Sequence, residues 1–321
     1  MPFFDLAPDA LARYRTATPA PADFDDFWAE TLAEAAAHPL EARFEPLAVG
    51  LKLVDVFDAS FAGYGGHPIK GWYLRPAGAK SGLTGIAKFI GYNGGRAFPH
   101  EHLLWPATGR AVFVMDTRGQ GSGWSRGETP DPVGSEPQHA GFMTKGIGSR
   151  DSYFYRRVFT DAVRAVAALQ SRPEIDPDRL AAVGGSQGGG ITLAVAGLVP
   201  AVKAAMPDVP FLCDFRRAVG LTTRDPYGEI VRYLSIHRDR AAAVYETLGY
   251  FDGVNFAARA RAAALFSVAL MDDVCPPSTV YAAFNAYAGA KSIAQYDFNN
   301  HEGGGPFQDR RQVAWLAEQG L

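Results

Sequence analysis

The feature that most constrains the fold is an alternation of short apolar runs with longer stretches of helical periodicity. This alternation predicts βαβ units and therefore a mostly parallel sheet. A β-hairpin is predicted around 51 to 75, and further strands are predicted at 86–90, 111–115, 180–183, 264–270 and 293–298. Helices are predicted at about 153–170, 191–198 and 278–287, and from about 307. We therefore expect an α/β fold with a mostly parallel central sheet flanked by helices.

Two segments lie outside this alternation. Within residues 1–40, an apolar stripe that includes Phe24, Phe27 and Trp28 predicts a helix, with Asp23 placed to cap it. The stripe must pack on the main body of this chain or on a neighbouring subunit. Residues from about 211 to 262 predict several helical segments instead of strands. We expect one domain over 1–321, with an N-terminal extension and a helical insertion before the penultimate strand.

Composition excludes several classes of protein. The net charge is -3, from 31 basic and 34 acidic residues, so no basic surface for nucleic acid is expected. Two cysteines are too few for a disulfide scaffold or a thiolate-rich zinc site. No signal-peptide pattern is present, and no apolar stretch approaches the ~20 residues that cross a bilayer. We therefore expect a cytoplasmic protein without membrane partner, metal or cofactor.

The strongest local motif is G-x-S-x-G at 184–188, which places Ser186 between an apolar strand and a helix. A nucleophilic serine requires such a tight strand-to-helix turn, because the turn exposes the hydroxyl group. The following helix start offers free N–H groups to a developing oxyanion. By itself the motif also fits a glycine-rich loop with no catalytic role. The full motifs of phosphate-binding loops and zinc helices are absent. The dinucleotide-binding motif is also absent, because the glycine-rich stretch at 119–123 has the spacing G-x-G-x-G.

An α/β-hydrolase places an acid and then a histidine downstream of its serine. Asp272 and Asp273 follow the strand at 264–270, and we favour Asp272 because it comes sooner after the strand. Asp273 is expected to cap the turn before the prolines at 276 and 277 or to be solvated. His301 follows the last predicted strand and completes the order. The neighbouring Glu302 is expected to organise the glycine loop at 303–305.

Structural roles are expected for Cys275 and for most of the other histidines. Cys275 is expected to contribute packing rather than chemistry. Six histidines lack a place after a strand downstream of the serine and the acid, and most are expected at the surface or in loops: His38, His67, His100, His102, His139 and His237.

These residues predict acyl transfer through a serine. His301 is expected to accept the proton of Ser186 and to return it to the leaving alcohol, while Asp272 orients the imidazole. The main-chain N–H of Gln187 is expected to form half of the oxyanion hole. The N–H of Tyr92, in the glycine-rich loop after the strand at 86–90, is expected to form the other half.

Several longer motifs resemble the carbohydrate esterase family 7 enzymes, which are acetyl xylan esterases and cephalosporin C deacetylases. The resemblance runs from Phe3 through the last predicted helix. It rests on GYNGGR at 91–96, RGQG at 118–121, GGSQGGG at 184–190, Asp272 with CPPSTV at 275–280, and NHEGGG at 300–305.

The resemblance implies an α/β-hydrolase fold with Ser186, Asp272 and His301 as the triad, and with Tyr92 and Gln187 as oxyanion donors. It implies removal of acetyl groups from short xylooligosaccharides and from cephalosporin C by a cytoplasmic homohexamer. The N-terminal helix and the hairpin would then contribute to subunit contacts. We also expect Tyr92 and Pro226 to bind substrate, and Arg118 to fix a loop. The alternatives are a hydrolase of larger acyl esters or peptides, and a non-catalytic binding protein.

Overall fold

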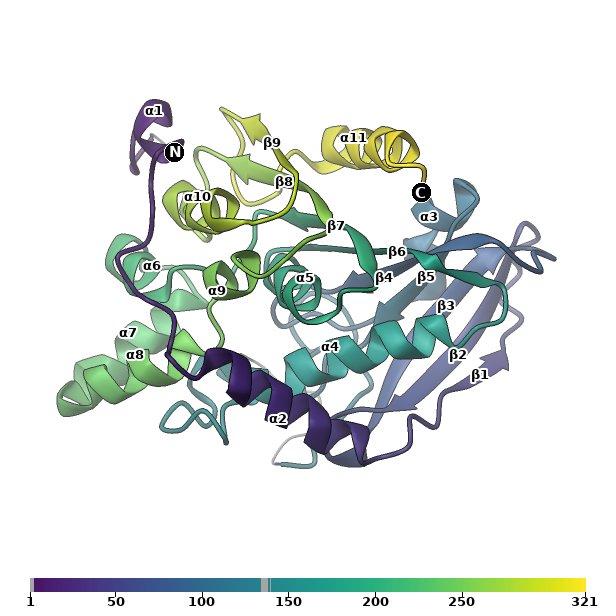
Figure 1. Cartoon of the computed structure of the whole chain (residues 1–321), viewed down its shortest axis with the longest axis horizontal. Coiled ribbons are helices and arrows are strands. Elements are labelled where there is room, and N and C mark those ends of the chain that lie inside the picture. The colour runs from purple at the N-terminus through teal and green to yellow at the C-terminus, as the bar shows by residue number, and fades with distance from the viewer. Residues whose placement is uncertain (1–2, 134–137, 139) are drawn as a thin grey trace.

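The computed structural model describes residues 3–133, 138 and 140–321. Within that part of the chain, nine strands form one sheet in the order β1-β2-β3-β5-β4-β6-β7-β8-β9 (Figure 1). Strands β4 to β9 run parallel to one another, whereas the pairs β1–β2, β2–β3 and β3–β5 are antiparallel. The strands are β1 Arg43–Pro46, β2 Val54–Ala62, β3 Pro68–Pro76, β4 Leu83–Phe89, β5 Ala111–Met115, β6 Ile175–Gly185, β7 Val202–Asp208, β8 Ala263–Ala269 and β9 Lys291–Tyr296. The predicted α/β architecture is confirmed.

Helices cover both faces of the sheet (Figure 1). The core on one face of the sheet includes residues of α2, α4, α5, α9 and α10, and the core on the other face includes residues of α3 and α11. The α-helices are α1 Pro8–Leu11, α2 Phe24–Ala36, α3 Leu104–Ala107, α4 Phe154–Gln170, α5 Gln187–Leu198, α6 Phe215–Leu221, α7 Tyr227–Ile236, α8 Ala241–Gly249, α9 Gly253–Ala257, α10 Pro277–Ala286 and α11 Gly305–Glu318. The 3-10 helices are η1 Tyr64–Gly66, η2 Pro99–His102, η3 Phe142–Thr144 and η4 Arg238–Arg240. Among the described residues, no helix has the length and apolarity needed to span a membrane.

Strand β5, in the interior of the sheet, shows why the sheet is buried on both sides. Phe113 and Met115 belong to the core on the α4 face, while Val112 and Val114 belong to the core on the α3 face. All five residues of this strand are buried. Such strands read as continuous apolar runs because helices cover both of their faces.

Helix α2 packs on the main body of its own chain. The Trp28 ring lies 5.9 Å from Phe159 and 5.3 Å from Phe256, measured between ring centroids, and its indole N–H donates to the Tyr250 carbonyl. The apolar stripe was expected to pack either on the main body of this chain or on a neighbouring subunit, and the structure shows it on the main body of this chain. The prediction that Asp23 caps the helix is wrong, because its carboxylate instead accepts from Arg150 and from the Tyr250 hydroxyl.

Strand β7 was not predicted from the sequence. Its residues Val202–Asp208 include two alanines and a proline, which are weak strand formers. The segment becomes a strand because it pairs with β6 on one side and β8 on the other. Helices α6 to α9 fill the predicted helical insertion. The division into one domain with an extension and an insertion stays a prediction.

Candidate active site

Ser186 lies at the sharp turn between β6 and α5. Its φ of 56° is in the left-handed region, which a residue with a side chain adopts at an energetic cost. A Cβ at Gly184 would come within 2.5 Å of the Gly188 main chain, and a Cβ at Gly188 would overlap the Phe89 carbonyl. Both glycines are therefore needed for strand, turn and helix to approach this closely. The Ser186 N–H donates to the Asp208 carbonyl at 2.9 Å and ties the turn to β7.

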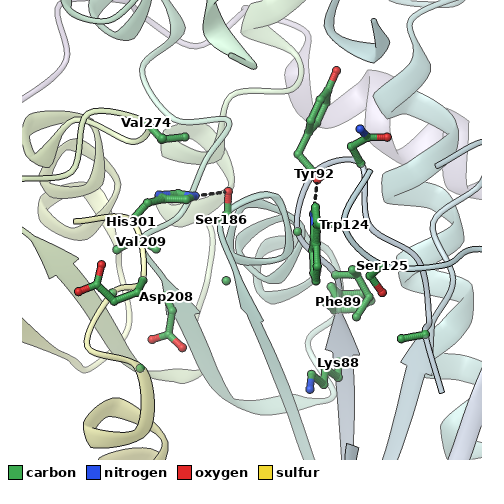
Figure 2. A pocket seen from close by; sticks show the side chains of 18 of the residues that line it. Lys88, Phe89, Tyr92, Trp124, Ser125, Ser186, Asp208, Val209, Val274 and His301 are labelled. Atoms are coloured by element: carbon green, nitrogen blue, oxygen red, sulfur yellow. Dashed lines mark hydrogen bonds between the residues drawn. The ribbon is translucent and has the colours of Figure 1, made fainter. Parts of the chain in front are cut away.

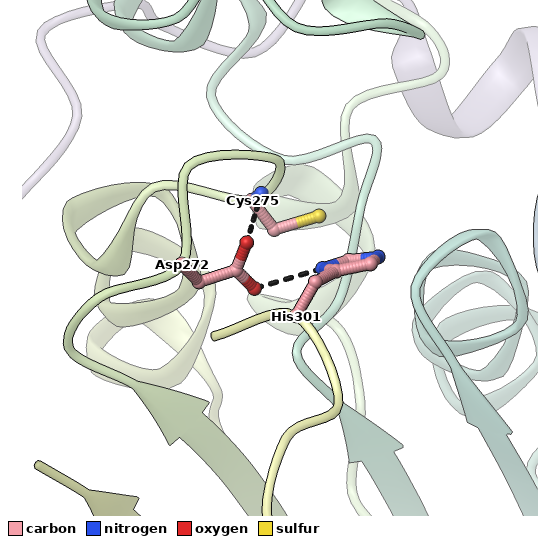
Figure 3. Close-up of side chains that lie close together, drawn as sticks. All are labelled: Asp272, Cys275 and His301. Atoms are coloured by element: carbon pink, nitrogen blue, oxygen red, sulfur yellow. Dashed lines mark hydrogen bonds and ion pairs between the residues drawn. The ribbon is translucent and has the colours of Figure 1, made fainter. Parts of the chain in front are cut away.

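Ser186, His301 and Asp272 form one hydrogen-bonded chain (Figures 2 and 3). The Ser186 Oγ lies 2.9 Å from His301 Nε2, and His301 Nδ1 lies 2.8 Å from Asp272 Oδ2. A carboxylate only accepts, so the partners assign the proton to Nδ1 and leave Nε2 as the acceptor for the serine hydroxyl. Asp272 is fully buried, and its Oδ1 accepts from the N–H groups of Val274 and Cys275. The structure therefore brings together the three residues predicted from chain order.

Asp273 and Glu302, which follow Asp272 and His301 in the sequence, have different partners from those expected. Asp272, not Asp273, accepts the turn N–H groups before the two prolines, while Asp273 pairs with Arg224 at 3.6 Å. Glu302 accepts from the Asn299 side chain and from the Asn300 N–H. Its carboxylate therefore braces the turn before His301, rather than the glycine loop after it.

The predicted oxyanion donors lie at two neighbouring strand ends. Gln187 is the first residue of α5, and Tyr92 follows β4. In the part of the chain that the structure describes, neither main-chain N–H donates to a protein acceptor. Free N–H groups are expected at the start of a helix, because the first turn has no intrahelical acceptors.

A glutamine that the sequence analysis did not select, Gln120, connects these two donors. Its side-chain amide exchanges two hydrogen bonds with the Gln187 amide, at 2.8 and 3.0 Å. Its Oε1 also accepts from the Asn93 N–H at 2.7 Å, one residue after Tyr92. The Tyr155 hydroxyl donates to Gln187 at 2.8 Å and completes the network. The signal in the sequence was the polar loop at 118–121, which follows a strand at the same edge of the sheet.

The Tyr92 side chain points away from Ser186 (Figure 2). Its hydroxyl donates to Glu229 Oε1 at 2.6 Å and accepts from the Phe142 N–H. Burial, followed by the Glu229 charge, raises the pKa of Tyr92 well above its usual value. Tyr92 and Pro226 both line the cavity at Ser186, so their predicted contact with substrate is compatible with their positions and stays a prediction.

Arg118 and the remaining histidines lie outside the hydrogen-bonded triad. Arg118 is fully buried and makes a bidentate pair with Asp161 of α4, at 2.6 and 2.7 Å. Of the histidines expected mostly at the surface or in loops, His102 is buried at the end of the short 3-10 helix η2. His139 lies outside the described residues.

Asp272, Cys275 and His301 are the described residues grouped closely enough to offer three ligand atoms to a metal ion (Figure 3). The observed hydrogen bonds explain the arrangement, because His301 Nδ1 is already bound to Asp272. Burial raises the pKa of the Cys275 thiol well above its usual value, which disfavours the thiolate that binds metal. This chemistry favours the acid–base pair over a metal site.

A cavity of about 770 Å³ opens at Ser186 and His301 (Figure 2). Besides these two residues, its lining includes aromatic, aliphatic and charged side chains. Those that matter below are Lys88, Tyr92, Glu101, Trp124, Pro226, Val274 and Asp309.

A serine, histidine and aspartate joined at the carboxyl edge of a mostly parallel sheet, with the serine on a strand-to-helix turn, define an α/β-hydrolase. Solved structures agree with this class. The chain is similar to the acetyl xylan esterase from Paenibacillus sp. R4, with a TM-score of 0.92 and 38% identity over 98% of this chain and 99% of that one. It is also similar to acetyl xylan esterase 1 from Thermoanaerobacterium sp. JW/SL YS485, with a TM-score of 0.89 and 31% identity over 98% and 99% of the two chains.

The sequence comparison specifies the family. The family model for acetyl xylan esterase (AXE1) matches residues 1–319. The chain is also 27% identical over 324 residues to acetyl esterase Axe7A of Xylanibacter ruminicola, covering 98% of this chain and 70% of the relative. This chain therefore belongs to the acetyl xylan esterase family and is a carboxylic ester hydrolase with a small-molecule substrate.

A more distant likeness concerns the fold alone. The acylaminoacyl peptidase of Pyrococcus horikoshii has a TM-score of 0.61 at 16% identity, over 84% of this chain and 42% of that one. At this identity the shared fold says nothing about a shared substrate.

Proposed function

We propose that this acetyl esterase removes acetyl groups from short acetylated xylooligosaccharides and from small esters such as cephalosporin C, through an acetyl-enzyme formed on Ser186. The hydrogen-bonded chain from Ser186 through His301 to Asp272 is the observation that carries the proposal. It supplies a nucleophile, a base and an orienting acid in one place, beside two free main-chain donors.

In the first half of the reaction, Ser186 Oγ attacks the acetyl carbonyl carbon while His301 Nε2 takes the hydroxyl proton. The carbonyl oxygen becomes an oxyanion and is held by the N–H groups of Gln187 and Tyr92. When the ester C–O bond breaks, His301 returns the proton to the leaving alcohol oxygen. The products of this half are the free alcohol and acetylated Ser186.

In the second half, water replaces the alcohol. His301 takes a proton from water as the water oxygen attacks the acetyl carbonyl, and the same two N–H groups hold the second oxyanion. Cleavage of the Ser186 Oγ–carbon bond releases acetic acid and returns the proton to the serine. Asp272 keeps Nδ1 protonated throughout, so Nε2 is available as the base at each step.

The choice of substrate is supported by the family and by the cavity. The matching family and the two solved structures above 30% identity are acetyl xylan esterases. A cavity of about 770 Å³ lies within the size range of small-molecule sites, so it has room for an alcohol group besides the acetyl group. Cephalosporin C is included because its acetyl ester fits the same chemistry and the motif resemblance implies it.

The test is a deacetylation panel of acetylated xylooligosaccharides, other acetylated sugars and cephalosporin C, with the wild type and Ser186→Ala. We expect the wild type to release acetate and the variant to lose at least about 10⁴-fold in rate. The control is Ser235→Ala, an exposed serine on α7, which should match the wild type. Acetate release by folded Ser186→Ala at the wild-type rate would refute the mechanism, and an inactive wild type would refute the substrate.

We further propose a cytoplasmic homohexamer. The hexamer is supported by the motif resemblance, and sedimentation of the purified protein at the mass of a single chain would contradict it. The cytoplasmic location is supported by the two cysteines, which are buried and form no disulfide. Thiols stay reduced in the cytoplasm, because that compartment is reducing. Recovery of the protein from a cell envelope or culture medium would contradict this location.

A further inference from the structure

The cavity is chemically different on its two sides. In Figure 2, Val274 lies on one side of the Ser186–His301 pair, and Lys88 and Asp208 lie on the other. The acidic side chains of Glu101 and Asp309 also line the cavity. An acetyl methyl group needs only a small apolar contact, so the charged side must serve the rest of the substrate.

Trp124 forms an exposed aromatic wall of this cavity. Its side chain is 67% exposed, yet its indole N–H donates to the Tyr92 carbonyl at 2.8 Å. The ring also rests against Gly94, where an added Cβ would overlap it. The indole is therefore held in one orientation while much of its surface remains open. A fixed, exposed tryptophan offers contact area to a ligand at a low cost in side-chain entropy.

Lys88 places a cation at the same cavity. Its Nζ lies 3.2 Å from His102 Nδ1, while His102 Nε2 donates to the Arg96 carbonyl at 2.8 Å. The imidazole is therefore neutral and accepts from the ammonium. No carboxylate among the described residues lies within ion-pair distance of Lys88. Burial lowers the pKa of Lys88, while the charges of Asp309 and Glu101 act in the opposite direction from farther away. The ammonium retains further N–H donors for a ligand.

We infer that Trp124, together with Lys88 and Asp309, forms a subsite for the sugar ring of the substrate. This inference rests on the proposed function. A pyranose ring has an apolar face of C–H groups that packs on an indole. Its edge carries hydroxyl groups, which accept from an ammonium and donate to a carboxylate. The alcohol part of the ester therefore occupies this side of the cavity, and the acetyl group lies toward Val274.

Two esters of the same acid test the subsite. Acetylated xylobiose and ethyl acetate present the same acetyl group, but only the first carries a sugar. For Trp124→Ala we expect the KM for acetylated xylobiose to rise about tenfold, the loss of a contact of ordinary aromatic strength. Because the indole also holds the Tyr92 carbonyl, we expect kcat/KM for ethyl acetate to fall as well, but by clearly less than kcat/KM for the sugar ester. Trp124→Phe should keep most of the preference for the sugar ester, because a ring is retained.

The control variant is Phe298→Ala, an aromatic residue that is 80% exposed and does not line the cavity. It should treat both esters as the wild type does. An equal loss on both esters would overturn the subsite, because it would show that Trp124 only supports the Tyr92 main chain. An unchanged KM for the sugar ester would also overturn it. Either result differs from failure of the proposed function, in which the wild type itself would not release acetate.

A measurement of binding supplies a second readout. In the Ser186→Ala background, titration with acetylated xylobiose should change the intrinsic tryptophan fluorescence, because the sugar would lie against an exposed indole. Trp124→Phe in the same background should abolish most of that change. A fluorescence change that survives Trp124→Phe would place the sugar elsewhere and overturn the inference.

Discussion

Gln120 forms no hydrogen bond with Ser186 or His301, yet it ties the segments of both predicted oxyanion donors into one network. Its amide pairs with Gln187 and accepts from the residue after Tyr92. One donor starts helix α5 and the other lies in the loop after β4, and catalysis by main-chain N–H groups depends on their placement before the reaction. Gln120 is therefore a positioning residue.

Gln120→Met keeps the side-chain volume and removes all three hydrogen bonds. We expect kcat for an acetyl ester to fall about ten- to a hundredfold, less than the loss of a donor itself, with KM changed little. Steady-state kinetics would measure this split. Gln319→Met, at the exposed end of α11, is the control. A variant that raised KM and left kcat unchanged would assign Gln120 to substrate binding instead.

His102 predicts a pH dependence of stability. Burial, followed by the Lys88 charge, lowers the pKa of His102 to about 4, against an ordinary value near 6.5. The unfolded chain then binds more protons than the folded chain between these values, so stability falls as the pH drops from 6.5 toward 4. From pH 7 to 5 this residue should remove about 2 kcal/mol from the free energy of unfolding.

Urea unfolding of the wild type and His102→Gln at pH 7 and 5 would measure this effect. Glutamine retains a donor for the Arg96 carbonyl and an acceptor for Lys88, but it does not titrate. We expect the variant to lose about 2 kcal/mol less than the wild type over this range. The same loss in both proteins would show that His102 does not titrate as described.

At the scale of elements, the sequence predicted most of the helices and strands but could not predict every partner. Strand β5 was predicted with its observed bounds, because all five of its residues are apolar and buried. Strand β7 was missed because its identity depends on pairing with β6 and β8, which lie apart from it in the chain. The predicted cap of α2 failed for a similar reason, because Arg150 and Tyr250 bind Asp23 from distant positions.

Trp28→Ala tests whether α2 belongs to the core of its own chain. The ring is 1% exposed and contacts aromatic residues of α4 and α9. Its removal should lower the free energy of unfolding by about 3–5 kcal/mol, the usual cost of deleting a buried aromatic side chain. Denaturant unfolding would measure this, with the exposed Phe3→Ala as the control. A variant that altered only subunit association would assign the stripe to an interface.

For the whole molecule, chain order identified more of the site than composition did. Ser186, Asp272 and His301 were predicted from their places after strands, because a parallel sheet brings strand ends to one edge. Gln120, Trp124 and Lys88 were missed because their partners are amides, glycines and a histidine with no fixed spacing. The triad follows from topology, whereas its supporting residues depend on packing that only the folded chain shows.

The central claim is that the acetyl group passes through Ser186. The most direct measurement is acid quenching of the enzyme during turnover of an activated acetyl ester, for which acylation outpaces hydrolysis, followed by peptide mass spectrometry. We predict one added acetyl group on the peptide that contains Ser186, and none on that peptide from Ser186→Ala. An acetyl group on another residue, or unchanged turnover by the variant, would contradict the account.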